Sequence, residues 1–183
     1  TELNVSGFNT RNVTDMGFMF GSCPLLTSID VSGFDTHNVT DMFGMFGECS
    51  ALMEIDVRGF YTRNVTNMRG MFYGCALLTT IDVSGFDTCN VTDMCSMFDG
   101  CTSLAEIDVS SFDTRNVTDM IAMFYNCNAL KRLEIDRFDT RKVKTFQSMF
   151  FNCPCVTRRD VAHFDTSSAS DADKMFDDWP KKN

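Results

Sequence analysis

The sequence predicts an α/β solenoid of about seven rungs, one per repeat, in which each rung is a short parallel strand followed by a short helix. Two columns of phenylalanine, each with a step of 26 residues, include most of the 18 phenylalanines in the chain. The first column is Phe8, Phe34, Phe60, Phe86, Phe112, Phe138 and Phe164. The second column is Phe20, Phe46, Phe72, Phe98, Phe124, Phe150 and Phe176. One repeat cannot bury its apolar face alone, so we expect consecutive repeats to stack.

The first half of each repeat alternates as a half-buried strand does. In the copy that runs from Leu26 to Phe34, apolar Ile29 and Val31 flank polar Asp30. A period of two places alternate side chains on opposite faces of a strand. We therefore expect a short strand at Ile-Asp-Val-Ser, ended by the Asp-Thr turn that follows it.

The second half of each repeat has the spacing of a helix. Met42, Met45, Phe46 and Cys49 fall at positions i, i+3, i+4 and i+7, which share one helical face. Thr40 precedes this face as an N-cap residue. The pattern predicts a short helix in each rung.

The two halves together carry a family resemblance. The stretch L-x-x-I-x-V-x-x-F has the core spacing of a leucine-rich repeat, and N-V-T-D-M-x-x-M-F-x-x-C completes the period. Together they resemble the 26-residue bacterial surface-protein repeat, the BspA-like branch of the leucine-rich repeats, over nearly the whole chain. The resemblance implies an exported recognition module, located outside the cell or on its surface, and its motif contains no catalytic residue.

The two ends differ from the middle of the array. We expect residues 1–164 to form the leucine-rich-repeat-like solenoid and residues 165–183 to form a degenerate last repeat and C-terminal cap around Trp179. Thr1 aligns with a position inside a strand, which predicts further repeats or an N-terminal cap before it.

The composition excludes some partner classes. A formal net charge of −9 and a pI near 4.6 disfavour nucleic acid and anionic membranes, which attract basic surfaces. No stretch predicts direct membrane insertion of this segment. The nine cysteines and 13 methionines fall largely on repeat columns, so we interpret them as core rather than as metal or cofactor ligands. Buried free thiols explain the cysteine column best, with disulfides between rungs as the alternative.

Asparagine sequons recur at the start of the helical half. They permit N-glycosylation if a eukaryote secretes the chain. The alternative is that Asn and Thr hydrogen-bond to the backbone of neighbouring rungs. The asparagines concerned are Asn4, Asn12, Asn38, Asn64, Asn90 and Asn116.

The outward face of the predicted strands is the candidate binding surface. Its middle column is acidic in successive repeats, and like charges one rung apart repel each other, which arginines, bound cations or a basic partner would offset. The alternative is that the carboxylates only keep the face soluble and unpaired. The candidate partner-binding residues are Asp56, Arg58, Asp82, Asp108, Arg132, Glu134, Asp136 and Arg158.

These observations lead to two hypotheses about function. Since no nucleophile, base or phosphate-binding loop stands apart from its column, we expect a protein that is not an enzyme and carries no cofactor. The first hypothesis is a recognition or adhesion module that binds a protein partner, or alternatively a glycan, through the strand face. The second is a structural or accessory spacer held within a larger multiprotein assembly.

Overall fold

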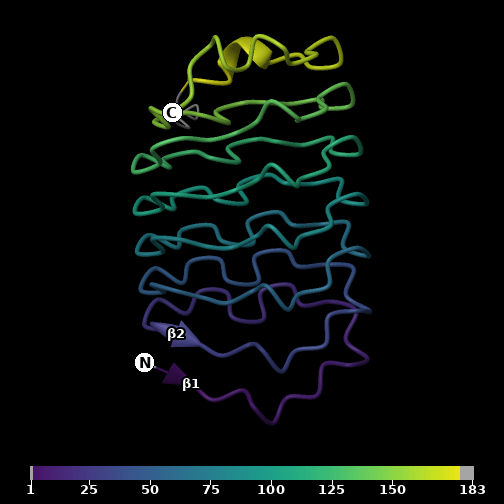
Figure 1. Cartoon of the computed structure of the whole chain (residues 1–183), viewed down its shortest axis with the longest axis vertical. Helices are drawn as coiled ribbons and strands as arrows, with labels where there is room; N and C mark the ends of the chain where they lie inside the picture. The colour runs from purple at the N-terminus through teal and green to yellow at the C-terminus, as the bar shows by residue number, and fades with distance from the viewer. Residues whose placement is uncertain (1, 178–183) are drawn as a thin grey trace, which may run out of the picture.

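The computed structural model describes residues 2–177. In Figure 1 the chain forms a stack of flattened coils, with the N-terminal coil at one end of the long axis and the C-terminal coils at the other. Backbone hydrogen bonds join neighbouring coils: the N–H of Phe20 donates to the carbonyl of Met45 at 2.9 Å, and the N–H of Phe46 donates to that of Met71 at 2.9 Å. Each coil is one rung.

Regular secondary structure is scarce in this stack. β1 (Glu2–Leu3) and β2 (Ser28–Ile29) pair in parallel, with Leu3 opposite Ile29. The 3₁₀ turn η1 (Ala172–Lys174) is the one helical segment within residues 2–177. Isolated parallel bridges connect other rungs, for example Asp93 with Asp119. The prediction of an α/β leucine-rich-repeat-like solenoid, with a parallel strand and a short helix in each rung, is therefore wrong.

Left-handed backbone conformations take the place of the predicted helices. Gly44 has a φ of +57° and Glu48 a φ of +61°, and equivalent residues share this conformation in the rungs between Phe18 and Asn152. A left-handed residue at every fourth position stops an α-helix from propagating, so the chain forms successive turns. The N–H of Met45, for example, donates back to the carbonyl of Met42 at 3.2 Å. Turns of this length bury the same positions that a helix would bury.

Side-chain caps shorten the predicted strands. Asp30 Oδ1 accepts the N–H of Ser32 at 2.9 Å, and the N–H of Phe34 donates to the carbonyl of Val31 at 3.0 Å. These local bonds use donors that a longer strand ladder would need. The predicted alternation is nevertheless present, because Ile29 and Val31 are buried whereas Asp30 is exposed.

The core lies inside the coils and repeats from rung to rung. Phe46, Phe72, Phe98 and Phe124 are fully buried, and the ring centroids of consecutive members lie 5.6–5.8 Å apart in stacked pairs. Buried methionines and cysteines of the same segments fill the space around the rings. Each rung thus buries its apolar side chains against its two neighbours, which is the packing that the repeat pattern predicts.

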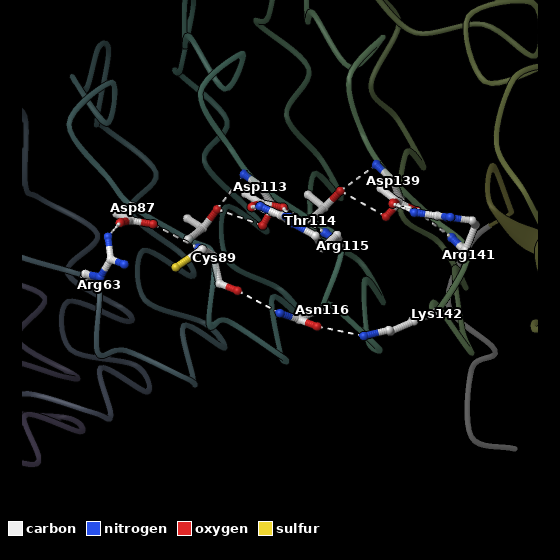
Figure 2. Close-up of polar contacts among 11 residues, drawn as sticks. Arg63, Asp87, Cys89, Asp113, Thr114, Arg115, Asn116, Asp139, Arg141 and Lys142 are labelled. Atoms are coloured by element: carbon white, nitrogen blue, oxygen red, sulfur yellow. Dashed lines mark hydrogen bonds and ion pairs between the residues drawn. The ribbon is translucent and has the colours of Figure 1, made fainter.

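A column of buried threonines, one at the same position of successive repeats, links neighbouring rungs through hydrogen bonds. Thr114 Oγ1 donates to the carbonyl of Asp139 at 3.0 Å and accepts the N–H of the same residue at 2.7 Å, as Figure 2 shows. Buried polar groups are costly unless they are paired, and this reciprocal pair satisfies the hydroxyl inside the stack. The column consists of Thr10, Thr36, Thr62, Thr88, Thr114 and Thr140.

The last repeat continues the pattern of bonds between rungs. The N–H of Phe150 donates to the carbonyl of Met175 at 2.9 Å, and Asp171 Oδ1 accepts the N–H of Phe146 at 2.9 Å. The proposed cap at residues 165–183 is described only as far as residue 177, so Trp179 lies outside the described residues. The division into an array and a cap stays a prediction.

Candidate functional site

The predicted acidic column forms one continuous surface, which we call the acidic face. Its carboxylates are Asp30, Asp56, Asp82 and Asp108, with Arg58 and Arg132 beside them. Each of these aspartates accepts the backbone N–H two residues further on, at 2.9–3.1 Å. Asp and Asn side chains commonly cap turns in this way. The column therefore has a structural role that accounts for part of its regularity.

The carboxylates of the acidic face are ionised at neutral pH. The hydroxyl and N–H of Ser84 hold the pKa of Asp82 below its usual value, and Ser110 does the same for Asp108. The Arg58 guanidinium, which lies 2.7 Å from a carboxylate oxygen of Asp56, lowers the pKa of Asp56 to about 2. The surface therefore carries full negative charges on successive rungs, and Arg58 offsets one of them.

Two of the hollows on the acidic face contain many of the predicted partner-binding residues. A hollow of about 420 Å³ is lined by Asp56, Arg58 and Asp82, and one of about 340 Å³ by Asp82, Asp108 and Arg132, each with neighbouring residues. Other residues of the same segments complete the lining, among them Ile55, Ile81 and Ile107. The structure thus brings together five predicted residues from three consecutive repeats and the start of the fourth.

The other predicted partner-binding residues lie in different surroundings. Glu134 forms an ion pair with Arg132, with 3.2 Å between Oε1 and Nη1. Arg158 lies over the ring of Phe176, with 5.2 Å from its guanidinium carbon to the ring centroid, and so packs on the last repeat. Asp136 is exposed and lines neither of the two hollows.

A larger hollow, which we call the glycine groove, lies on a different surface formed by the left-handed turns. It has a volume of about 780 Å³ around Gly74 and Gly100, and Tyr73, Asp99 and Tyr125 line it. A smaller hollow of about 320 Å³ adjoins it and shares Glu48 and Tyr73. The glycine groove shares no lining residue with the two hollows of the acidic face.

The glycine groove is open because glycine takes the place of larger residues at one repeat position in two consecutive rungs. Gly74 and Gly100 occupy the left-handed position that Glu48 holds in the preceding rung and Asn126 in the following one. Glycine adopts this conformation at no steric cost, so the sequence pattern alone reads as a turn requirement. The sequence analysis did not predict this groove. The signal that could have indicated it is the presence of glycine, which has no side chain, at the same repeat position in two consecutive rungs.

Polar groups converge on the glycine groove. Ser96 Oγ donates to Asp99 Oδ2 at 3.3 Å, and Ser22 Oγ donates to Glu48 Oε2 at 2.8 Å. Burial raises the pKa of Asp99 to about 6. The pKa of the Tyr73 phenol is raised by burial and by the nearby charges of Asp99 and Glu48. The groove therefore combines aromatic surface with hydroxyl donors and carboxylate acceptors.

One cluster beside the groove has the donor atoms of a metal site. Asp93, Cys95 and Asp119 each place a ligand atom within 4.8 Å of the other two. Arg69 already lies there, with 3.9 Å between its Nη1 and Asp93 Oδ2, and both carboxylates accept a backbone N–H. A cation would have to compete with the guanidinium, so we assign no metal to this cluster.

The sequon asparagines belong to a network between rungs. Asn116 Nδ2 donates to the carbonyl of Cys89 at 2.8 Å, and its Oδ1 accepts from Lys142 Nζ at 2.7 Å, as Figure 2 shows. Three other sequon asparagines donate in the same way to the preceding rung at 2.8 Å: Asn38, Asn64 and Asn90. Asn4 caps Ser6, and Asn12 is exposed. Glycosylation of these asparagines stays a prediction, and each bond gives its amide a structural role.

The cysteine column also bonds between rungs. Cys75 and Cys101 donate their thiols to the carbonyls of Phe46 and Phe72, each at 3.2 Å. Burial raises the pKa of Cys75 to about 12 and that of Cys101 well above its usual value. Cys95, which lies off this column, is also buried. The buried column therefore consists of protonated, unreactive thiols.

Comparison with known proteins supports the repeat character. Residues 1–103 and residues 75–183 each match the family described as "Mycoplasma protein of unknown function, DUF285". No curated protein and no solved structure matches significantly. Within residues 2–177, no helix has the length and apolar character needed to span a membrane. Because the two overlapping matches cover the whole chain and repeat the same pattern, the chain is a repeat protein that belongs to the DUF285 family.

Proposed function

We propose that the chain is a non-enzymatic recognition module of a secreted or cell-surface protein, and that it binds a protein with a basic surface through the acidic face. The resemblance of its repeat to the BspA-like bacterial surface-protein repeat supports the location. The charge and shape of the acidic face support the mode of binding.

The observation that carries this proposal is a row of negative charges that turn capping does not require. Asn4 caps its turn just as the aspartates do, since its Oδ1 accepts the N–H of Ser6 at 3.0 Å. An amide is therefore sufficient for capping, yet Asp30, Asp56 and Asp82 carry a carboxylate at this position in the next three repeats. Carboxylates on successive rungs repel one another, and a basic partner would relieve that repulsion, so we attribute the charges to a partner that they attract.

The expectation that the protein is not an enzyme is part of the proposal. The imidazole of His37 stacks on the ring of Tyr61, with 4.4 Å between centroids, and its Nδ1 lies 2.8 Å from Asp35 Oδ1. His163 packs edge-on against Phe164. Both histidines thus have packing roles on the surface of the stack.

The test compares three forms of the chain as bait for solubilised surface proteins of the cells that make it and of the cells they meet. The first bait is the unaltered chain, and the second carries Asp56→Asn, Asp82→Asn and Asp108→Asn. The third is a matched control with Asp35→Asn, Asp87→Asn and Asp139→Asn, which removes the same charge from another column of turn caps. Proteins retained on each bait are quantified by mass spectrometry.

We expect a protein with a basic surface to be retained at least about tenfold better by the unaltered chain and the control than by the acidic-face variant. Raising the salt concentration should weaken that retention, because the charges that attract the partner are exposed. Equal retention by all three baits would refute the proposal. Retention of a large assembly that is indifferent to the acidic-face substitutions would instead support a spacer within a complex.

A further inference from the structure

We propose that the glycine groove is a second binding site, separate from the acidic face, and that it takes a short uncharged oligosaccharide. The volume of about 780 Å³ is within the usual range of ligand sites. The ligand class follows from the main chain, the side-chain column and the charge of the groove.

The main chain around the groove is already bonded between rungs. The N–H of Gly74 donates to the carbonyl of Asp99 at 2.7 Å, and the N–H of Gly100 donates to that of Tyr125 at 2.8 Å. The N–H of Ser96 likewise donates to the carbonyl of Ile121 at 2.8 Å. A peptide that adds itself as a strand needs main-chain partners of this kind. Recognition in the groove must therefore use side chains.

The side chains along one wall repeat with the rungs. Tyr73, Asp99 and Tyr125 occupy the same repeat position, 26 residues apart, and line the groove on three consecutive rungs. Neighbouring rungs are about 4.8 Å apart where their backbones pair, which is close to the length of one pyranose unit. A linear oligosaccharide laid along the stack therefore meets the Tyr73 ring, the Asp99 carboxylate and the edge of the half-buried pair in which Tyr125 stacks on Phe151, with 5.1 Å between centroids.

These groups suit polyhydroxylated rings. Tyr73 is 41% exposed, and the negative face of an aromatic ring attracts the C–H bonds on one side of a pyranose. The Asp99 and Glu48 carboxylates accept from hydroxyl groups in short, charge-assisted hydrogen bonds. Ser22 and Asn126 add a hydroxyl and an amide to the lining.

The charge of the groove selects against acidic sugars. Glu48 and Asp99 line it, and Asp93 lies beside it, whereas Arg69 is the basic residue of the lining. An anionic sugar would face these carboxylates, and like charges brought together at a binding site oppose binding. The uncharged class is therefore preferred.

The test is calorimetric titration of the full chain with neutral tetrasaccharides, namely cellotetraose, chitotetraose, maltotetraose and mannotetraose, and with an oligogalacturonate of the same length. The key variant is Gly100→Asn, which fills the groove. Asn holds the same left-handed position in the next rung at Asn126, where φ is +57°, so the variant keeps the backbone. Tyr73→Ala is a second variant that does not depend on backbone conformation. Asp82→Asn, on the acidic face, is the control.

We expect at least one neutral tetrasaccharide to bind, and we expect Gly100→Asn and Tyr73→Ala each to weaken it at least about tenfold while Asp82→Asn leaves it unchanged. Failure of every neutral sugar to bind, preference for the oligogalacturonate, or binding that is indifferent to both groove variants would overturn the assignment. Because the two surfaces share no lining residue, loss of sugar binding and loss of the protein partner report separately on the two proposals.

Discussion

Thr88 and Asp113 exchange two hydrogen bonds across neighbouring rungs. Thr88 Oγ1 donates to the carbonyl of Asp113 at 3.0 Å and accepts the N–H of Asp113 at 2.8 Å. The Thr88 side chain is fully buried, so water cannot replace either bond. One hydroxyl therefore satisfies both main-chain groups of a residue in the next rung.

Replacing this hydroxyl by a methyl group should destabilise the stack. Thr88→Val keeps the shape but leaves the N–H and carbonyl of Asp113 without their partner, which costs about 1–3 kcal/mol in the free energy of unfolding. Thr88→Ser retains the hydroxyl and should cost less than Thr88→Val. Urea unfolding followed by circular dichroism gives both values. A Val variant as stable as the Ser variant would contradict the structural role of the pair.

The left-handed turns predict a conformational cost that does not depend on packing. Gly70 has a φ of +60°, and a Cβ added there meets only Tyr73 Cβ, at the ordinary distance of 3.6 Å. Gly70→Ala should therefore lose about 1–2 kcal/mol through backbone strain alone. Gly59→Ala is the matched control, because a Cβ there meets nothing within 4 Å and its φ is not left-handed. Thermal unfolding should separate the two variants, and equal midpoints would argue against the turn conformation.

The stability of the fold should depend on the ionisation of Asp99. Burial raises its pKa from 3.8 to about 6, so between these values the folded chain holds a proton that the unfolded chain releases. The contribution of Asp99 to the free energy of unfolding therefore falls as the pH rises from about 4 to about 6. Asp99→Asn should flatten that part of the profile and stabilise the chain at pH 7 by up to about 1 kcal/mol, since partial exposure reduces the effect.

The profile of Asp99→Asn is measured by urea unfolding at several pH values beside the unaltered chain. Asp82→Asn serves for comparison, because the pKa of Asp82 is lowered and its contribution to stability is lost as the pH falls. An unaltered slope between pH 4 and 6 in Asp99→Asn would show that another group controls this range.

The cysteines should differ widely in reactivity. Cys101 and Cys127 are buried and burial raises the pKa of both, whereas half-buried Cys23 and Cys89 are accessible to a reagent, although the hydrogen bond with Asp87 raises the pKa of Cys89. Only the thiolate is a good nucleophile, so iodoacetamide should label Cys23 and Cys89 in the folded protein and spare Cys101 and Cys127 until it is denatured. Peptide mass spectrometry gives the order of labelling. Equal labelling of Cys101 and Cys89 in the folded protein would contradict the buried column.

The sequence predicted which residues are buried better than it predicted their backbone conformation. Met42, Met45, Phe46 and Cys49 are all buried, as their spacing indicates. Their helical period arises instead from consecutive turns, because the residue at position 44 adopts a left-handed φ. A spacing of three and four residues cannot distinguish these two conformations, since both bury the same positions.

The candidate site was predicted in part, because residue spacing indicates which side chains share a face but not which hydrogen bonds they form. Exposed charges such as Asp56 and Asp82 could be placed on one face from the period of two, and the structure brings them together. Their capping bonds could not be read from that period, because an Asp in a turn and an Asp on a strand have the same spacing. The groove at Gly74 was not predicted, because a glycine can be present either to allow a turn or to leave space for a ligand, and the sequence does not distinguish these two reasons.

The bonds between rungs give the chain a fixed unit of length. Since Thr62 contacts Asp87 as Thr88 contacts Asp113, each rung offers its successor the same donors and acceptors. A genetic duplication or loss of 26 codons, or of a multiple of 26, would therefore rejoin equivalent surfaces, whereas a number that is not a multiple would place unlike residues against each other at the junction. Genes for such proteins can lengthen or shorten by whole repeats, and the reach of a binding surface can change without the evolution of a new fold.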